Sequence, residues 1–200
     1  MEKYQGIKFE YCRTKPLFKY DHRLEILNHW SVLFGELGLA PVHSSGTYGN
    51  QSYRTSSSSF IITRTGMCPR TPCNEDDFVH VTGFDAESGV FTTEGTAVPS
   101  SECYLHNALY VSLPKINAIL HGHSPLLCHF ADQLNIPETH KFYDYGTPEL
   151  AESALQLLKR QRDFFILKDH GFVALGQDIE SAGRLTLDYY LKLITLIRDS

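Results

Sequence analysis

Hydrophobic and polar positions follow two different periods along this 200-residue chain. Behind Asp21, a plausible helix N-cap, apolar residues recur every three or four positions, which predicts a helix. The apolar residues of this helix are Leu24, Leu27, Trp30, Leu33 and Leu37. From residue 44 to residue 98 the apolar runs are short and are broken by Gly, Pro and Asn, which predicts strands. We expect these strands at 51–54, 60–63, 78–84 and 90–93, with a tight turn at 85–89.

The second half of the chain alternates between helix-like and strand-like segments. Helical spacing behind polar caps predicts helices at 100–110, 124–132, 147–161 and 178–198. Apolar runs predict strands at 117–121, 164–167 and 172–175. We therefore expect an α/β fold, with residues 1–200 forming a single domain whose central, largely antiparallel β-sheet is flanked by helices in an α/β/α arrangement. The order of the strands stays open.

Composition narrows the class of protein. With 42% hydrophobic and 20% charged residues, the chain is typical of a soluble domain. A net charge of −5 argues against nucleic acid or an anionic membrane as the main partner. No stretch reaches the roughly 18 apolar residues of a membrane helix, and residues 1–18 lack a signal-peptide core. The five cysteines are odd in number and lack CxxC spacing, so we expect a reduced, cytoplasmic protein.

Three histidines are candidate metal ligands. His121 and His123 end an apolar run and are two residues apart, so both imidazoles lie on one face of an extended strand. His170 lies in a turn between two predicted strands. Three histidines that leave coordination positions open are the usual arrangement for catalytic zinc. Glu102 begins the helix before the histidine-bearing strand and could reach the same space. Capping or core hydrogen bonding by histidine is the alternative, and spacing alone does not decide between them.

Two turns and one helix start are candidates for anion binding. Segments 46–50 (GTYGN) and 63–66 (TRTG) combine glycines, which allow close approach of the backbone, with polar side chains. Ser100 and Ser101 add hydroxyls at a helix start, where the helix dipole favours negative charge. Ordinary turns and caps use the same residue types. The informative observation is that all three occur together with the HxH strand.

Five short motifs follow one another along the chain: GTYGNQSYR, ITRTG, PSSE, HGHSP and KDHG. Together they resemble the class II aldolase/adducin family, in particular its L-fuculose-1-phosphate aldolase type, from about residue 24 to residue 192. The resemblance implies that His121, His123 and His170 hold Zn²⁺, with Mn²⁺, Co²⁺ or Fe²⁺ as alternatives. It implies that Glu102 is the catalytic acid/base. It also implies that six residues hold the substrate phosphate: Thr47, Asn50, Thr65, Gly66, Ser100 and Ser101.

The function implied by the resemblance is a metal-dependent retro-aldol cleavage of a short sugar phosphate into dihydroxyacetone phosphate and an aldehyde. The implied assembly is a homotetramer with active sites between subunits. Epimerase, decarboxylase or dehydratase chemistry on a related sugar phosphate is the alternative, and a non-catalytic adducin-type module is a further one. Related epimerases typically have aspartate at the position of Glu102, so this residue favours the aldolase.

One segment departs from the family pattern. Residues 134–145 are much shorter than the corresponding part of the aldolase, which carries a tyrosine that acts as a proton donor across a subunit boundary. Tyr143 and Tyr145 are present here, but neither can be matched to that tyrosine, so catalysis and packing both stay open. The particular reaction is therefore less constrained than the metal and phosphate sites.

Three further residues have two possible roles each. His106, one helical turn after Glu102, either orients that carboxylate or packs in the helix interface. Arg54 and Arg64 either add positive charge beside the phosphate or face solvent from their strands. The sequence does not choose between these roles.

Overall fold

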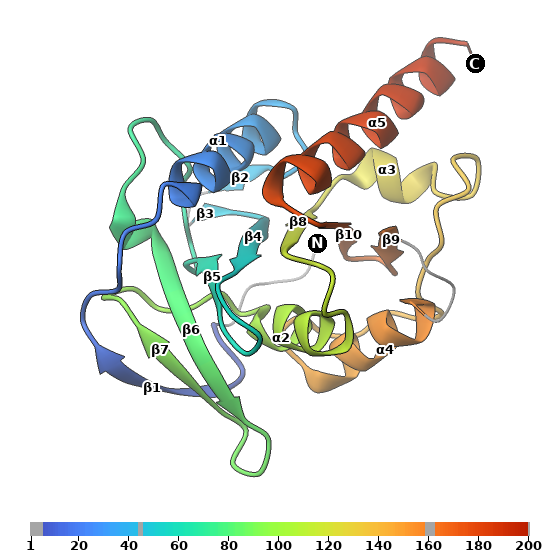
Figure 1. Cartoon of the computed structure of the whole chain (residues 1–200). Coiled ribbons are helices and arrows are strands. Elements are labelled where there is room, and N and C mark those ends of the chain that lie inside the picture. Colours follow the sequence, from blue (N-terminus) through green and yellow to red (C-terminus); the bar gives the residue numbers. More distant parts are fainter. Residues whose placement is uncertain (1–5, 44–45, 159–162, 200) are drawn as a thin grey trace.

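The computed structural model describes residues 6–43, 46–158 and 163–199. Within these residues an eight-stranded sheet forms the centre of the molecule, with helices on both faces (Figure 1). The strand order is β1-β7-β6-β5-β4-β8-β10-β9, and a separate pair is formed by β2 and β3. Neighbouring strands of the large sheet are antiparallel, except that β1 runs parallel to β7. The predicted α/β fold with a largely antiparallel centre is confirmed.

The strands of the large sheet are β1 (Glu10–Lys15), β4 (Gly49–Arg54), β5 (Phe60–Thr63), β6 (Phe78–Asp85), β7 (Val90–Glu94), β8 (Ala118–Gly122), β9 (Phe164–Leu167) and β10 (Gly171–Gly176). The small pair consists of β2 (Val42–His43) and β3 (Gly46–Thr47). The helices are α1 (Arg23–Glu36), α2 (Cys103–Ser112), α3 (Pro125–His129), α4 (Pro148–Leu158) and α5 (Ile179–Arg198).

Two hydrophobic cores lie on opposite faces of the sheet. One packs α1, α3 and α5 against the sheet, and the other packs α2 and α4 (Figure 1). Successive residues of a strand point to opposite faces, so Leu120 of β8 joins the first core and Ile119 the second. This three-layer packing explains why the central strands read as continuous apolar runs. No helix in the described part of the chain is long and apolar enough to span a membrane.

Several element boundaries differ from the prediction. His22, rather than Asp21, is the N-cap of α1; Asp21 Oδ1 instead accepts a hydrogen bond from the backbone N–H of Arg23 at 3.0 Å. The helix α2 begins at Cys103, later than the predicted 100, and α3 ends at His129, before the predicted 132. The predicted helix 147–161 is helical to residue 158, and residues 159–161 lie outside the described residues.

Strand β1 is absent from the prediction. Its sequence EYCRTK shows no apolar alternation, and all but one of its residues are exposed. Charged, exposed side chains are typical of a strand at the edge of a sheet, where they discourage pairing with another chain. Its place beside β7 depends on pairing between distant segments, which local pattern does not encode.

Candidate active site and metal centre

Three histidines converge where β8 ends beside β4 and β10. His121 lies on β8, opposite Asn50 of β4 and Val173 of β10. His123 follows this strand, and His170 lies in the turn between β9 and β10. One ring nitrogen from each histidine lies within 4.8 Å of the others. Imidazoles on one tetrahedral Zn²⁺ would place these nitrogens about 3.3 Å apart, so small side-chain movements suffice to share an ion.

A hydrogen bond fixes which nitrogen of His121 faces this cluster. Its Nδ1 lies 2.7 Å from the backbone oxygen of Phe172, which can only accept, so Nδ1 carries the hydrogen. Burial lowers the pKa of His121 to about 4, so the ring is neutral at neutral pH. Nε2 therefore presents a lone pair, 3.0 Å from Nε2 of His123. Metal-binding histidines typically donate their other N–H to a backbone carbonyl or carboxylate in this way, so the donor set fits a divalent ion.

Glycine allows the histidine-bearing segments to approach one another. A Cβ added to Gly171 would lie 2.4 Å from the backbone oxygen of Gly122 and 3.1 Å from ring atoms of both His121 and His123. A contact as short as 2.4 Å essentially never occurs with a real Cβ, and contacts of 3.1 Å would require the rings to move. Glycine at position 171 is therefore one reason why the three imidazoles can meet.

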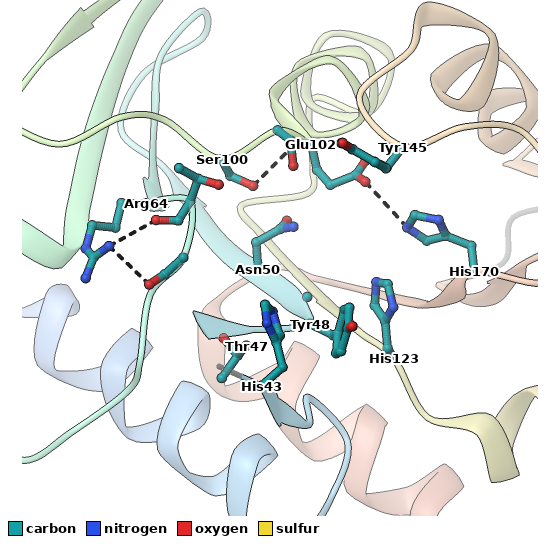
Figure 2. Close-up of a pocket in the computed structure, with 14 residues that line it drawn as sticks. His43, Thr47, Tyr48, Asn50, Arg64, Ser100, Glu102, His123, Tyr145 and His170 are labelled. Atoms are coloured by element: carbon teal, nitrogen blue, oxygen red, sulfur yellow. Dashed lines mark hydrogen bonds and ion pairs between the residues drawn. The ribbon is translucent and has the colours of Figure 1, made fainter. Parts of the chain in front are cut away.

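Glu102 lies beside the histidines at the start of α2. Its side chain is almost fully buried, and Oε1 lies 3.4 Å from Nε2 of His170, as the dashed line in Figure 2 shows. Burial raises the pKa of this carboxyl, but the hydrogen bond and the charge interaction with His170 outweigh that effect, so the pKa lies below its ordinary value. Glu102 is thus ionised at neutral pH and able to accept a proton.

The residues predicted to bind phosphate line one pocket together with Glu102, His123 and His170 (Figure 2). They come from β3, β4, the turn after β5 and the turn before α2: Thr47, Asn50, Thr65, Gly66, Ser100 and Ser101. Asn50 Oδ1 is buried and has no hydrogen-bond partner among the described residues. The Thr47 hydroxyl donates to the backbone oxygen of Met67 at 3.0 Å, so it would have to rotate to donate to a ligand.

The two glycine-containing turns touch through their backbones. Gly46 has a φ of +142°, and a Cβ there would lie 2.5 Å from Cα of Gly66. We expect Gly46→Ala to lower the free energy of unfolding by about 1–3 kcal/mol, because it adds both backbone strain and a backbone clash. Urea unfolding measures this change. Gly83→Ala is the matched control, since a Cβ there meets nothing within 4 Å, and equal destabilisation by the two substitutions would contradict the prediction.

Arg54 and Arg64, whose roles the sequence did not decide, lie in different parts of the structure. Arg64 lines the pocket, but its guanidinium bonds Asp77 at 3.0 Å and the backbone oxygens of Thr65 and Gly66 at 3.0 and 3.1 Å. These hydrogen bonds within the protein stabilise the turn at residues 63–66, so the Arg64 guanidinium is already paired. Arg54 donates instead to three backbone oxygens in and after α2, those of Tyr110, Leu113 and Ile116. Its role is to hold the end of that helix.

The structure distinguishes the two tyrosines whose roles the sequence left open. Tyr145 lines the pocket and is 6% exposed, with Nζ of Lys8 lying 3.9 Å from the centre of its ring. Tyr143 instead lines a separate hollow with residues of α4. Tyr145 is therefore the tyrosine of this pair that can meet a ligand beside Glu102.

Two aromatic residues that sequence reasoning did not assign also line the pocket. Tyr48 stacks on His123 with ring centres 5.4 Å apart, and His43 lies 4.3 Å from Tyr48. Tyr48 is part of the GTYGN motif, which was the available signal. Nothing in that local sequence indicates that its ring contacts His123, which lies 75 positions later in the sequence.

A family model, the Class II Aldolase and Adducin N-terminal domain, matches residues 34–189. The chain belongs to the class II aldolase and adducin family. Class II aldolases are metal-dependent, and the histidine cluster of this family member can hold a metal ion. Its curated relatives within the family indicate an enzyme.

Individual members of the family give further comparisons. The L-fuculose phosphate aldolase of Escherichia coli (strain K12) is 31% identical over 155 residues, which is 70% of this chain and 67% of that protein. For the L-fuculose phosphate aldolase of Methanocaldococcus jannaschii, the match spans only 56% of that protein. A methylthioribulose-1-phosphate dehydratase of Yersinia enterocolitica is 35% identical over 96 residues, 48% of this chain and 40% of that protein. A solved L-fuculose 1-phosphate aldolase has a TM-score of 0.70 and 24% identity, covering 90% of this chain and 88% of that one.

Proposed function

We propose that this family member is a Zn²⁺-dependent lyase that cleaves a short sugar phosphate into dihydroxyacetone phosphate and an aldehyde. The observation that carries the proposal is the content of one pocket. A buried, ionised carboxylate, imidazoles of a three-histidine cluster and polar turns suited to phosphate all face the same space (Figure 2). The L-fuculose phosphate aldolase relatives support this choice of reaction.

In this proposal His121, His123 and His170 hold the ion. A bound divalent ion supplies a Lewis acid that stabilises negative charge on substrate oxygens, an effect worth several kcal/mol. His121 is oriented for this role because its Nδ1–H is held by the backbone oxygen of Phe172. Mn²⁺, Co²⁺ or Fe²⁺ suit the same imidazole donors, and Zn²⁺ is our choice on the basis of three histidine ligands with open positions.

Glu102 moves the proton in the proposed reaction. Its carboxylate is ionised and lies beside His170 at the pocket wall, so it can accept a proton from the substrate and return one at the same carbon. The polar residues of the turns would hold the phosphate group in the same pocket. Asn50 would donate to a phosphate oxygen from its side-chain Nδ2, because its buried Oδ1 can only accept, and Ser100 and Ser101 contribute hydroxyls at the start of α2.

Dehydration of a related sugar phosphate is the second candidate function. The methylthioribulose-1-phosphate dehydratase relative favours it, and a metal and a carboxylate base suit this reaction as well. Epimerisation is less supported because Glu102 stands where related epimerases typically have aspartate. A module without chemistry has no use for an ionised carboxylate buried beside three imidazoles.

The deciding experiment is a cleavage assay with zinc-loaded protein and a panel of ketose 1-phosphates. Release of dihydroxyacetone phosphate is followed with and without a chelator. Release that the chelator abolishes supports the lyase. The rates of release then rank the ketose 1-phosphates, which differ in the aldehyde that cleavage would produce. Confirmed metal binding with no release from any substrate contradicts it, and loss of water from a methylthioribulose-1-phosphate-like substrate would then identify the dehydratase.

We also propose a homotetramer with active sites between subunits. Its support is the family membership, and α5 offers exposed apolar side chains that an interface can cover, Leu191, Ile194 and Ile197. Light scattering on the purified protein measures the mass directly. A monomer at micromolar concentration contradicts the proposal.

A further inference from the structure

A buried chain of polar side chains lies behind Glu102, between α2 and β4. Its centre is His106, one helical turn after Glu102 and with no exposed surface. His106 Nδ1 lies 2.6 Å from Oγ of Ser52, and this oxygen lies 2.8 Å from the hydroxyl of Tyr110. Within the described residues, these three side chains are not among those that line the pocket. They are polar groups without a role in the mechanism so far.

Two buried polar atoms beside this chain lack partners. His106 Nε2 and Glu102 Oε2 are both buried, and neither has a hydrogen-bond partner in the part of the chain that the structure describes. Leaving one such atom unpaired costs about 1–3 kcal/mol, and more for a charged group. Residues four apart at a helix start lie on the same side of the helix, so the two atoms belong to neighbouring side chains.

The direction of the hydrogen bonds follows from counting hydrogens. Burial lowers the pKa of His106 to about 3, so its ring is neutral and carries one N–H. Burial raises the pKa of Tyr110, so its hydroxyl keeps its hydrogen. If Tyr110 donates to Ser52 and Ser52 donates to His106 Nδ1, the ring hydrogen lies on Nε2.

The opposite direction satisfies fewer groups. It would leave the hydroxyl hydrogen of Tyr110 without an acceptor among the described side chains, because Ser52 Oγ is its side-chain partner there. It would also turn a lone pair of His106, rather than an N–H, toward the region of the Glu102 carboxylate. Since unpaired buried groups are costly, the first direction is favoured.

We propose that His106 is a positioning residue for Glu102, whose Oε2 is joined to Nε2–H of His106 by hydrogen bonds through one buried water. Ser52 and Tyr110 fix the tautomer that makes Nε2 the donor. Held on Oε2 by this charge-assisted bond, the carboxylate keeps Oε1 toward His170 and the pocket. The inference rests on the proposed function in taking Glu102 as the group that moves the proton.

The tautomer can be tested without any activity assay. In protein labelled with ¹⁵N-histidine, the ¹⁵N chemical shifts of each ring show which nitrogen carries hydrogen. The signals of His106 are identified by their absence from the spectrum of His106→Gln. We expect a neutral ring with hydrogen on Nε2. A ring with hydrogen on Nδ1, or a charged ring, would overturn the inference.

Two substitutions test the consequence for catalysis. In His106→Gln the side-chain amide nitrogen can take the place of Nε2, whereas in His106→Asn it reaches only the place of Nδ1. We expect His106→Asn to lower kcat by about 10–100-fold, with KM and zinc content unchanged, and His106→Gln to recover most of that loss. The matched control is His29→Asn, at an exposed position of α1, which should leave kcat unchanged.

The outcomes separate this inference from the proposed function. Equal losses of kcat in the two His106 variants would mean that the residue only packs, and would overturn the positioning role. If His106→Asn fails to fold, the tautomer measurement on the unmodified protein decides. If the unmodified protein cleaves no sugar phosphate, the proposed function fails and the ¹⁵N result alone decides whether His106 donates from Nε2.

Discussion

Replacing His123 with alanine is expected to release the divalent ion and abolish lyase activity. The substitution removes one of three imidazoles that share the cluster, and the two that remain cannot complete a three-histidine site. Loss of a partner outside the ligand shell already costs about 10–100-fold in metal affinity, so loss of a ligand should exceed about 100-fold. Metal content after dialysis, measured by plasma mass spectrometry beside the cleavage assay, checks both effects.

His123 is the most informative of the three positions. It follows β8 and its ring stacks on Tyr48, so its truncation leaves the strand pairing intact. His121 is fully buried, and His121→Ala should release the ion but also destabilise the fold. The matched control is His129→Ala, an exposed histidine at the end of α3, which should keep its metal. Full zinc occupancy in His123→Ala would show that the ion is held elsewhere.

Elements with a strong local pattern could be predicted from the sequence, whereas strand pairing could not. The helix predicted at 178–198 is α5, where Asp178 forms a capping box with Ser181. That signal is local, since cap and apolar stripe lie in one segment. The pairing of β4 with β8 joins Asn50 to His121, and β1 pairs with β7. Such contacts depend on which distant segments meet, which hydrophobic periodicity does not specify.

The candidate site shows the same division between local and tertiary information. The pairing of His121 with His123 follows from strand geometry, but His170 joins them only because β10 lies beside β8. From the sequence His170 was a candidate because of its place in a turn, and the resemblance to the family implied that it joins the other two histidines. The place of Tyr145 depends on the path of a segment that differs from the family pattern. The surroundings of His106 likewise required the packing of α2 on β4.

Substituting Glu102 with glutamine is expected to remove most turnover while the metal stays bound. Glutamine has nearly the same shape, so the start of α2 and the three histidines keep their positions, but the amide cannot accept a proton from the substrate carbon. Loss of a general base typically lowers the rate by about 10²–10⁴-fold. We therefore expect kcat to fall within that range, with zinc content equal to that of the unmodified protein.

A second readout separates the proton-transfer step from the choice of sugar. Incubated in D₂O with dihydroxyacetone phosphate alone, the unmodified protein should exchange a proton of the hydroxymethyl carbon, and Glu102→Gln should not. The matched control is Glu149→Gln, an exposed glutamate in the first turn of α4, which should exchange normally. Normal exchange by Glu102→Gln would show that another group moves the proton. Tyr145, whose ring also lines the pocket, would then be the next residue to substitute.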